Sequence, residues 1–225
     1  LFRSDQPNAC RRFETSEGWF CMQLMRIEPI TIDRQQYLYV MSAGESYNSD
    51  GKLGENGHAQ AGLGGLFVLV MTLQGWRTAA ATAAITNGQW GIPQIDQLKL
   101  TQIGAKRWGW VGRMGGSGAG GESNEQWLVY APIGRVVKEI ANLDAAHDYT
   151  GQDFIEQIST QWRWLRKQPM DAGFYRVHWS RQVTTTPLDT DRLEPIASST
   201  KIEHTQGIAK FDQTAGQYTL IKQTE

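Results

Sequence analysis

Hydrophobic residues occur along the chain in short runs separated by polar turns. Residues 35–43 (QQYLYVMSA) are rich in aromatic and β-branched side chains, and residues 62–76 (GLGGLFVLVMTLQGW) hold a longer apolar run. From Gln97 onward, such runs recur about a dozen residues apart and end in glycine or polar residues. This spacing is typical of an antiparallel meander, so it predicts a mostly β fold with little helix.

The C-terminal half contains two predicted hairpins. The runs 153–168 and 173–186 are joined by a turn with Pro169 and Gly173, and residues 208–221 read as two strands around QTAG. Before these hairpins, AAHDYTGQD (145–153) predicts a turn. Between them, PLDTDRLEPIASST (187–200) is the most linker-like segment of the chain.

Two segments interrupt the pattern. Residues 77–88 (RTAAATAAITNG) contain alanines that favour a helix. The segment is short, however, carries three threonines and lacks an amphipathic stripe of large residues, so a short helix and an exposed strand both stay open. Pro29 is expected to break the apolar run 19–32, because proline cannot donate to a strand ladder.

These elements predict a single β-rich domain over residues 1–225, with a sandwich or a curled antiparallel sheet as its architecture. Residues 98–151 place four strands in about the length of one propeller blade, so a propeller-like fragment is the alternative. A chain of this size can bury roughly 70% of its unfolded surface, which supports a core without further staples.

Composition narrows the partner classes. The chain has 225 residues, a formal net charge of -1 and 40% hydrophobic residues. A general nucleic-acid binder needs a basic excess, so nucleic acid is not an expected partner. The apolar run 66–73 is far shorter than the ~18 residues of a membrane helix, so an integral membrane protein is not expected either.

The two cysteines, Cys10 and Cys21, lie close together near the N-terminus. The alternatives are two free thiols or a disulfide that ties residues 1–18, and the position favours the disulfide. Disulfides persist in oxidising compartments. Because the sequence also begins with Leu1 rather than Met, we expect a periplasmic or extracellular protein.

The glycine run RWGWVGRMGGSGAGG (107–121) matches the spacing of a dinucleotide-binding loop at three glycines. That loop works only between a strand and a helix, and residues 122–132 have a strand-like pattern instead. We therefore predict a mobile loop between two strands. Its glycines are Gly115, Gly116, Gly118, Gly120 and Gly121.

No catalytic motif is evident. The four histidines lack metal-ligand spacing, Ser117 does not sit in a nucleophile elbow, and no catalytic residue is assigned. His147 beside Asp148, or His178, would matter only if a carboxylate faced it in a pocket. Asp144, Asp148 and Asp153 leave calcium as a possibility, but they are fewer than the six or more oxygens that calcium takes. We therefore expect no cofactor.

Paired tryptophans are the most suggestive binding feature. Trp108 and Trp110 share one strand face, as do Trp162 and Trp164, with Arg163 between the second pair. If a pair faces solvent it forms a stacking surface; if it faces inward it belongs to the core. The sequence favours a non-catalytic exported binding or structural protein of a bacterial-type cell envelope, with a glycan or another envelope component as the possible ligand. The alternative is a secreted or periplasmic hydrolase.

We predict that Cys10 and Cys21 are linked. Closing this short loop is expected to stabilise the fold by roughly 3 kcal/mol through loop entropy. Peptide mapping by mass spectrometry without reductant should recover the two cysteines in one cross-linked peptide pair. Two thiols that alkylate readily in freshly prepared protein would contradict the bond.

Overall fold

The computed structural model describes residues 11–16, 18–47, 60–117, 122–189 and 194–222. These residues form fourteen strands and two short 3-10 helices. In chain order they are β1 (Arg11–Thr15), β2 (Gly18–Ile32), β3 (Gln35–Tyr47), β4 (Gly62–Thr72), β5 (Gly75–Asn87), η1 (Ile95–Gln97), β6 (Lys99–Gly104), β7 (Arg107–Ser117), β8 (Ser123–Ile133), β9 (Val136–Thr150), β10 (Phe154–Leu165), β11 (Arg176–Asp189), β12 (Glu194–Pro195), η2 (Ala197–Ser199), β13 (Lys201–Asp212) and β14 (Gln217–Lys222).

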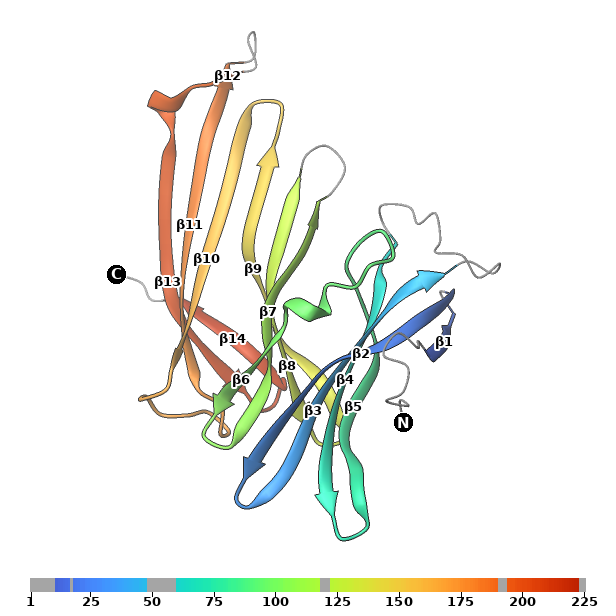
Figure 1. Ribbon diagram of the computed structural model, residues 1–225. Helices are drawn as coiled ribbons and strands as arrows, with labels where there is room; N and C mark the ends of the chain where they lie inside the picture. The colour runs from blue at the N-terminus through green and yellow to red at the C-terminus, as the bar shows by residue number, and fades with distance from the viewer. Residues whose placement is uncertain (1–10, 17, 48–59, 118–121, 190–193, 223–225) are drawn as a thin grey trace. The chain divides into compact units, whose positions relative to one another are not determined.

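The strands pair into one open and mostly antiparallel sheet (Figure 1). The main order is β1-β2-β3-β4-β5-β9-β10-β11-β13-β14, with β6, β7 and β8 joined to it through β9. Most neighbours are consecutive in the chain, as in a meander. The prediction of a mostly β fold with an antiparallel meander and little helix is confirmed.

By its internal contacts the chain divides into two compact units. Unit 1 comprises Leu1–Leu100 and Tyr130–Lys138, and unit 2 comprises Thr101–Val129 and Glu139–Glu225. The expectation of a single domain over residues 1–225 stays a prediction.

In unit 1, the apolar faces of β2, β3 and β4 supply the core. Phe20, Met22 and Leu63 form a buried cluster. Tyr39 is also buried, and its burial raises the pKa of its hydroxyl to about 12. The helix η1 adds Ile95, which is fully buried, and Arg26 donates a hydrogen bond of 3.1 Å to the carbonyl of Leu98 just beyond this helix.

Pro29 does not break the second strand. It lies within β2 and pairs with Leu38 of β3. On its other side, β2 pairs with β1 only over residues 18–22. Among the described residues, therefore, no strand lies beside Pro29 on that side. Proline is tolerated on an edge that needs no donor, and this corrects the expected interruption.

The alanine-rich segment is a strand, not a helix. It forms β5, which pairs with β4 along most of its length and is irregular at two points. β5 also meets β9 in parallel at Ala81 and Val136, where Ala81 N–H donates to the Arg135 carbonyl over 3.1 Å. Hydrogen-bonding partners on both sides outweigh the small helical preference of alanine.

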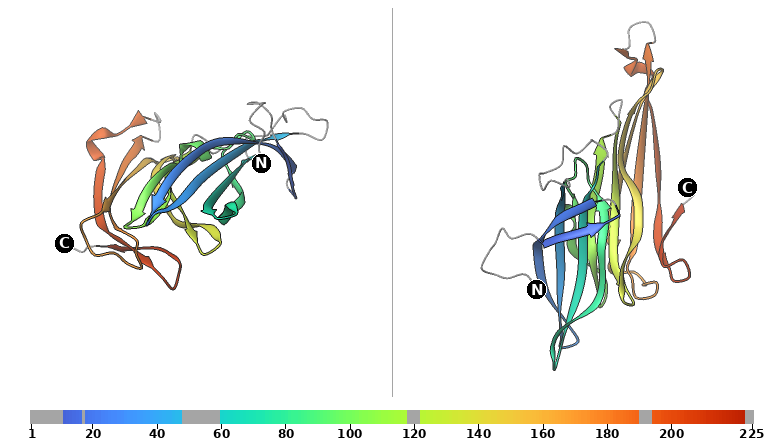
Figure 2. Two further views of the ribbon diagram at one scale, coloured as in Figure 1. Left: turned by 60° about the horizontal axis from the view of Figure 1, so that its bottom comes forward. Right: turned by 90° about the vertical axis from the view of Figure 1, so that its right-hand side faces the viewer.

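Unit 2 contains the long strands β10, β11 and β13 and most of β9, which lie side by side (Figures 1 and 2). Both predicted hairpins are present: β10 pairs with β11, and β13 pairs with β14. The predicted turn at 145–153 is shorter than expected, because β9 continues to Thr150 and pairs there with β10. The linker-like segment begins later too, since β11 extends to Asp189.

An aromatic cluster joins the second hairpin to the rest of unit 2. Phe174 stacks on Phe211 with ring centroids 4.0 Å apart, and Tyr218 lies edge-on to both. The Tyr218 hydroxyl donates to the Tyr175 carbonyl over 2.7 Å. Burial, and then the nearby charge of Asp171, raises the pKa of this hydroxyl above its usual range.

Replacing Tyr218 with Phe removes this hydroxyl and is expected to lower the free energy of unfolding by about 1 kcal/mol at neutral pH. Because the pKa of Tyr218 is raised on folding, the unfolded chain loses its proton first above its ordinary pKa of 10.0. Stability therefore falls as the pH rises above that value. Urea unfolding should show a shallower fall in the Tyr218→Phe variant, and an unchanged pH dependence would contradict the assignment.

Candidate functional site

Unit 2 contains a cavity of about 430 Å³ on one face of β10, β11 and β13, which we call the arginine pocket. Strands β9 and β14 contribute the remaining walls. Its lining residues are Asn142, Leu143, Asp144, Thr160, Trp179, Arg181, Val183, Thr205, Leu220 and Lys222. A volume in this range suits a small organic ligand.

The strand registers place the floor of this pocket. Thr160 of β10 lies opposite Arg181 of β11, which lies opposite Thr205 of β13. Trp179 and Val183 are two residues from Arg181 on either side, so they share its face. Three residues that are far apart in sequence thus form one cross-strand row, with an indole beside it.

Opposite Trp179 lies Gly207, and its lack of a side chain makes room for the indole. A Cβ built there would lie 2.9 Å from Cζ2 of Trp179 and 2.1 Å from the carbonyl oxygen of Ile221. Any other residue would therefore push against both β14 and the floor of the pocket.

Beside the pocket, β9 and β10 separate. Among the described residues, the pairing of these two strands begins at Ile155 opposite Thr150 and ends at Ser159 opposite Ala146. The next carbonyl, that of Thr160, accepts a hydrogen bond of 3.1 Å from the indole N–H of Trp127 on β8. The part of β9 beyond the ladder provides a wall of the pocket.

Three buried polar atoms of the lining have no hydrogen-bond partner among the described residues. They are Oγ1 of Thr160, Nε1 of Trp179 and Nε of Arg181. Thr160 is 7% exposed and Trp179 is 4% exposed. Nε1 of the neighbouring Trp162 is in the same state. Buried donors without partners are costly and uncommon. Because these atoms have almost no accessible area, they lie beneath the surface of the cavity.

The charges of the pocket do not balance. Nη1 of Arg181 lies 3.8 Å from the Asp144 carboxylate, at the outer limit of an ion pair. Lys222 is a second cation and makes no ion pair with a described residue. Two cations therefore face one carboxylate in the lining.

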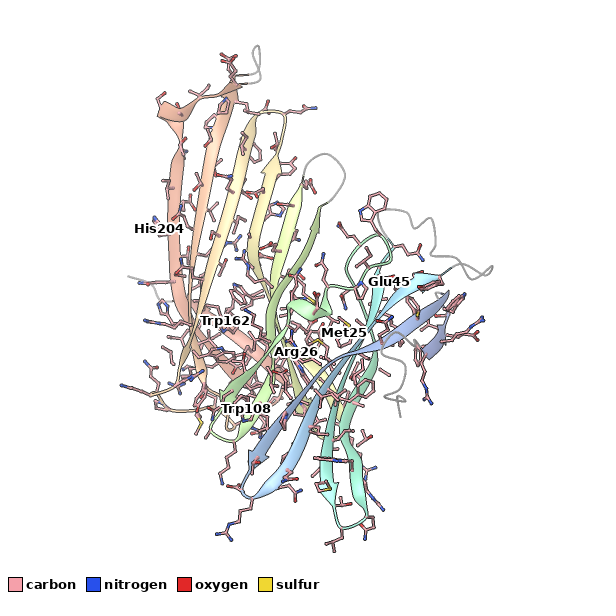
Figure 3. The ribbon with its side chains drawn as sticks, viewed as in Figure 1. Met25, Arg26, Glu45, Trp108, Trp162 and His204 are labelled. Carbon is pink, nitrogen blue, oxygen red and sulfur yellow. The ribbon has the colours of Figure 1, made fainter. Side chains whose placement is uncertain are left out.

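A different cavity, which we call the polar pocket, is lined mainly by residues of the opposite face of the same strands and shares Arg181 and Thr205 with the arginine pocket. It measures about 530 Å³ and is lined by Ser159, Gln161, Ser180, Arg181, Gln182, His204, Thr205 and Gln206. In Figure 3, His204 projects from β13. This lining has neither a carboxylate nor an aromatic ring other than that histidine.

A third cavity lies in unit 1 and measures about 260 Å³. A bulge in β2 between Leu24 and Arg26 leaves Met25, which is 49% exposed, without a partner in the register with β3. Met25 lines this cavity together with two carboxylates, Glu45 and Asp96. Met25 on β2 and Glu45 on β3 are labelled in Figure 3.

The two tryptophan pairs, for which a stacking surface and a core position both stay open in the sequence, differ in burial. Trp110 is fully buried and Trp108 is half-buried on β7. Trp162 and Trp164 are half-buried on β10, and each lies edge-on to Tyr218 with ring centroids 6.0 Å apart.

These contacts give Trp162 and Trp164 a packing role within unit 2. Arg163, between them, is exposed and lies opposite His178. A ligand at these side chains stays a prediction.

Two glycines of the expected loop belong to a strand instead. Gly115 and Gly116 lie in β7, whereas Gly118, Gly120 and Gly121 are outside the described residues. A Cβ on Gly115 would lie 2.1 Å from the carbonyl oxygen of Asn124, so the two strand backbones can approach here only with glycine. A strand, not a helix, begins at Ser123, as the loop prediction required.

The predicted disulfide is only half within the described residues. Cys21 lies on β2 opposite Arg12 of β1 and lines the unit 1 cavity, whereas Cys10 lies outside the described residues. The register brings the start of β1 beside this part of β2, which favours the bond. It stays a prediction.

No contact among the described residues supports the histidine–carboxylate pairings or the calcium site that the sequence suggested. His147 stacks against Tyr149 at 6.3 Å, and none of the three cavities has both a histidine and a carboxylate in its lining.

Of the three aspartates, Asp144 pairs with Arg181, Asp148 accepts a hydrogen bond of 3.2 Å from Ser123, and Asp153 precedes β10. Asp144 and Asp148 are four residues apart on one strand, a span of roughly 13 Å. Within the described parts of the chain, no group of three ligating side chains is placed to hold a metal ion. Calcium binding there stays a prediction.

Sequence reasoning missed Arg181, Thr160 and Trp179. The alternation in residues 173–186 does show that Trp179, Arg181 and Val183 share a face. Nothing local indicates that Thr160 and Thr205 lie beside them, because that depends on the register of two hairpins.

Comparison of the chain with protein-family models, with curated proteins and with solved structures found no match. In the described part of the chain, no helix has the length and hydrophobicity needed to cross a membrane.

Proposed function

We propose that this protein is a non-catalytic binding protein whose ligand occupies the arginine pocket. One observation carries the proposal: a single cavity of about 430 Å³ is lined by two cations, Arg181 and Lys222, against one carboxylate, with an indole and aliphatic side chains beside them. A concave site with apolar walls and a few charged groups is typical of small-molecule binding sites.

The lining supports binding over catalysis. Its one carboxylate, Asp144, is engaged with Arg181, and neither histidine, cysteine nor serine lines the cavity. A hydrolase with a histidine base would need that histidine beside a carboxylate or a nucleophile in one cavity, and none of the three described cavities pairs a histidine with a carboxylate. A binding role needs only the donors and walls that are present.

We further propose, from the predicted disulfide, that the protein acts in a periplasmic or extracellular space. A glycan as ligand has less support than the paired tryptophans implied, because Trp110 is buried and Trp162 and Trp164 pack on Tyr218. The arginine pocket has apolar walls as well as donors, and this favours a ligand with an apolar part.

The neutral fluorescent probe N-phenyl-1-naphthylamine tests the proposal. We expect saturable binding to the full chain, and at least tenfold weaker binding to the Val183→Phe variant, because the added ring fills the cavity. The matched control is Gln182→Phe, which places the same ring one residue away on the opposite face, in the lining of the polar pocket. This control should bind like the unmodified protein.

Circular dichroism should confirm that each variant is folded. If Val183→Phe does not fold, Leu220→Trp replaces it, since Leu220 is 42% exposed and also lines the pocket. Unchanged probe binding by the pocket-filling variants, or loss of binding only in Gln182→Phe, would place any site elsewhere and overturn the proposal. Failure of the unmodified protein to bind would also overturn it.

A further inference from the structure

We infer that the free edge of β14 binds an extended peptide segment of another protein, one that carries an acidic residue opposite Lys222 and apolar residues beside it. The peptide would pair antiparallel with Gln217–Lys222 and add one strand to the sheet. Leu220 and Lys222 also line the arginine pocket. The binding groups here are those of the strand edge, however, so the inference goes beyond the proposed function and does not rest on it.

The first reason is the unpaired backbone of β14. This strand is the last in the order of the sheet, and its only described partner is β13. Its second edge makes no backbone hydrogen bond with a described residue. In an antiparallel sheet, alternate residues direct both their N–H and their C=O groups to the same side. The edge therefore offers donors and acceptors that the backbone of an extended peptide satisfies.

The second reason is that this edge lacks the features that usually prevent pairing. At the opposite end of the strand order, β1 carries Arg11, Arg12 and Glu14, and the part of β2 beyond β1 carries a bulge and Pro29. Charges, bulges and proline all hinder the addition of a strand. The strand β14 (QYTLIK) has neither bulge nor proline, and Lys222 is its one charged residue. Its edge is therefore the more open of the two to a further strand.

The third reason is the exposed apolar surface of β14. Leu220 is 42% exposed and Ile221 is 44% exposed. As consecutive residues of a strand, they project from opposite faces of the sheet. They lie opposite Ala209 and Ile208 of β13, which cover only one side of each. A strand added at the edge would cover the other side of both.

The fourth reason is the charge of Lys222, which selects the kind of peptide. Lys222 makes no ion pair with a described residue. On β13 it lies opposite Gly207, which has no side chain to meet it. An acidic residue at the facing position of an added strand would supply a counter-charge, because opposite charges directly across two strands attract each other.

A second copy of the chain fits this edge less well than a peptide does. If two copies paired antiparallel about Leu220, each Lys222 would lie opposite Tyr218, and its charge would stay without a counterpart. The contact would also span only the 6 residues of β14 in each copy, against roughly 20–30 residues a side in a standard protein–protein interface. A short extended peptide needs no more than this length.

Fluorescence polarisation with labelled hexapeptides tests the inference. The sequence EVITVT, read antiparallel to β14, places its glutamate opposite Lys222 and its isoleucine opposite Leu220. We expect saturable binding of this peptide to the full chain, and roughly fivefold weaker binding of KVITVT, in which the charge is reversed. Lys222→Glu should exchange the two preferences.

Lys210→Glu is the matched control, because Lys210 lies on β13 opposite Thr219 and therefore not on the free edge. It makes the same change of charge one strand away and should keep the preference for EVITVT. A preference that is lost equally in both variants would show general attraction of acidic peptides and would overturn the inference.

N-methylation of alternate residues tests the strand pairing itself. Only alternate N–H groups of an added antiparallel strand face β14. EVITVT that is methylated on the nitrogens of one alternate set should therefore lose binding, whereas the peptide methylated on the other set should keep it. Equal binding by the two methylated forms overturns strand addition, and so does failure of EVITVT to bind.

This inference and the proposed function fail independently. Val183→Phe fills the arginine pocket and should leave peptide binding unchanged. A loss of peptide binding as large as the loss for N-phenyl-1-naphthylamine would place the peptide in the pocket and overturn the inference. A dimer of the chain that sedimentation detects and EVITVT dissociates would show that a second copy occupies the edge, which also overturns it. Exchanged preferences in Lys222→Glu alone, with one methylated form inactive, support the inference even if no small ligand binds the pocket.

Discussion

The register between β10, β11 and β13 is the constraint on which the candidate site depends. It sets Thr160, Arg181 and Thr205 opposite one another and brings Trp179 beside them. Because side chains alternate between the faces of a sheet, a shift of one residue in either hairpin would send this whole set to the other face. The same register places serine, glutamine and histidine side chains on the opposite face.

The aromatic cluster in unit 2 helps to hold that register. Phe174 precedes β11, Phe211 is on β13 and Tyr218 is on β14, so their contacts tie together both hairpins that form the pocket floor. Trp162 and Trp164 extend the cluster from β10. Two of the tryptophans that suggested a binding surface thus act as packing for a site whose donors come from other residues.

The candidate site combines groups that folding alone does not satisfy. Gly207, opposite Trp179, has no side chain and so leaves room for the indole. The indole N–H is buried without an acceptor among the described residues. The separation of β9 from β10 opens the wall that a continuous ladder would have closed. A buried donor without an acceptor lowers the stability of the fold locally.

The sequence by itself determined the β class, both C-terminal hairpins and the strand that follows the glycine run. These depend on alternation and turn residues, which act over a few neighbouring positions. It did not determine that the alanine-rich segment forms β5, that β2 continues through Pro29 or that β9 extends to Thr150. These outcomes depend on pairing with neighbouring strands. Only the tertiary structure brought Thr160, Trp179 and Arg181 together, because cross-strand neighbours are fixed by registers between segments distant in sequence.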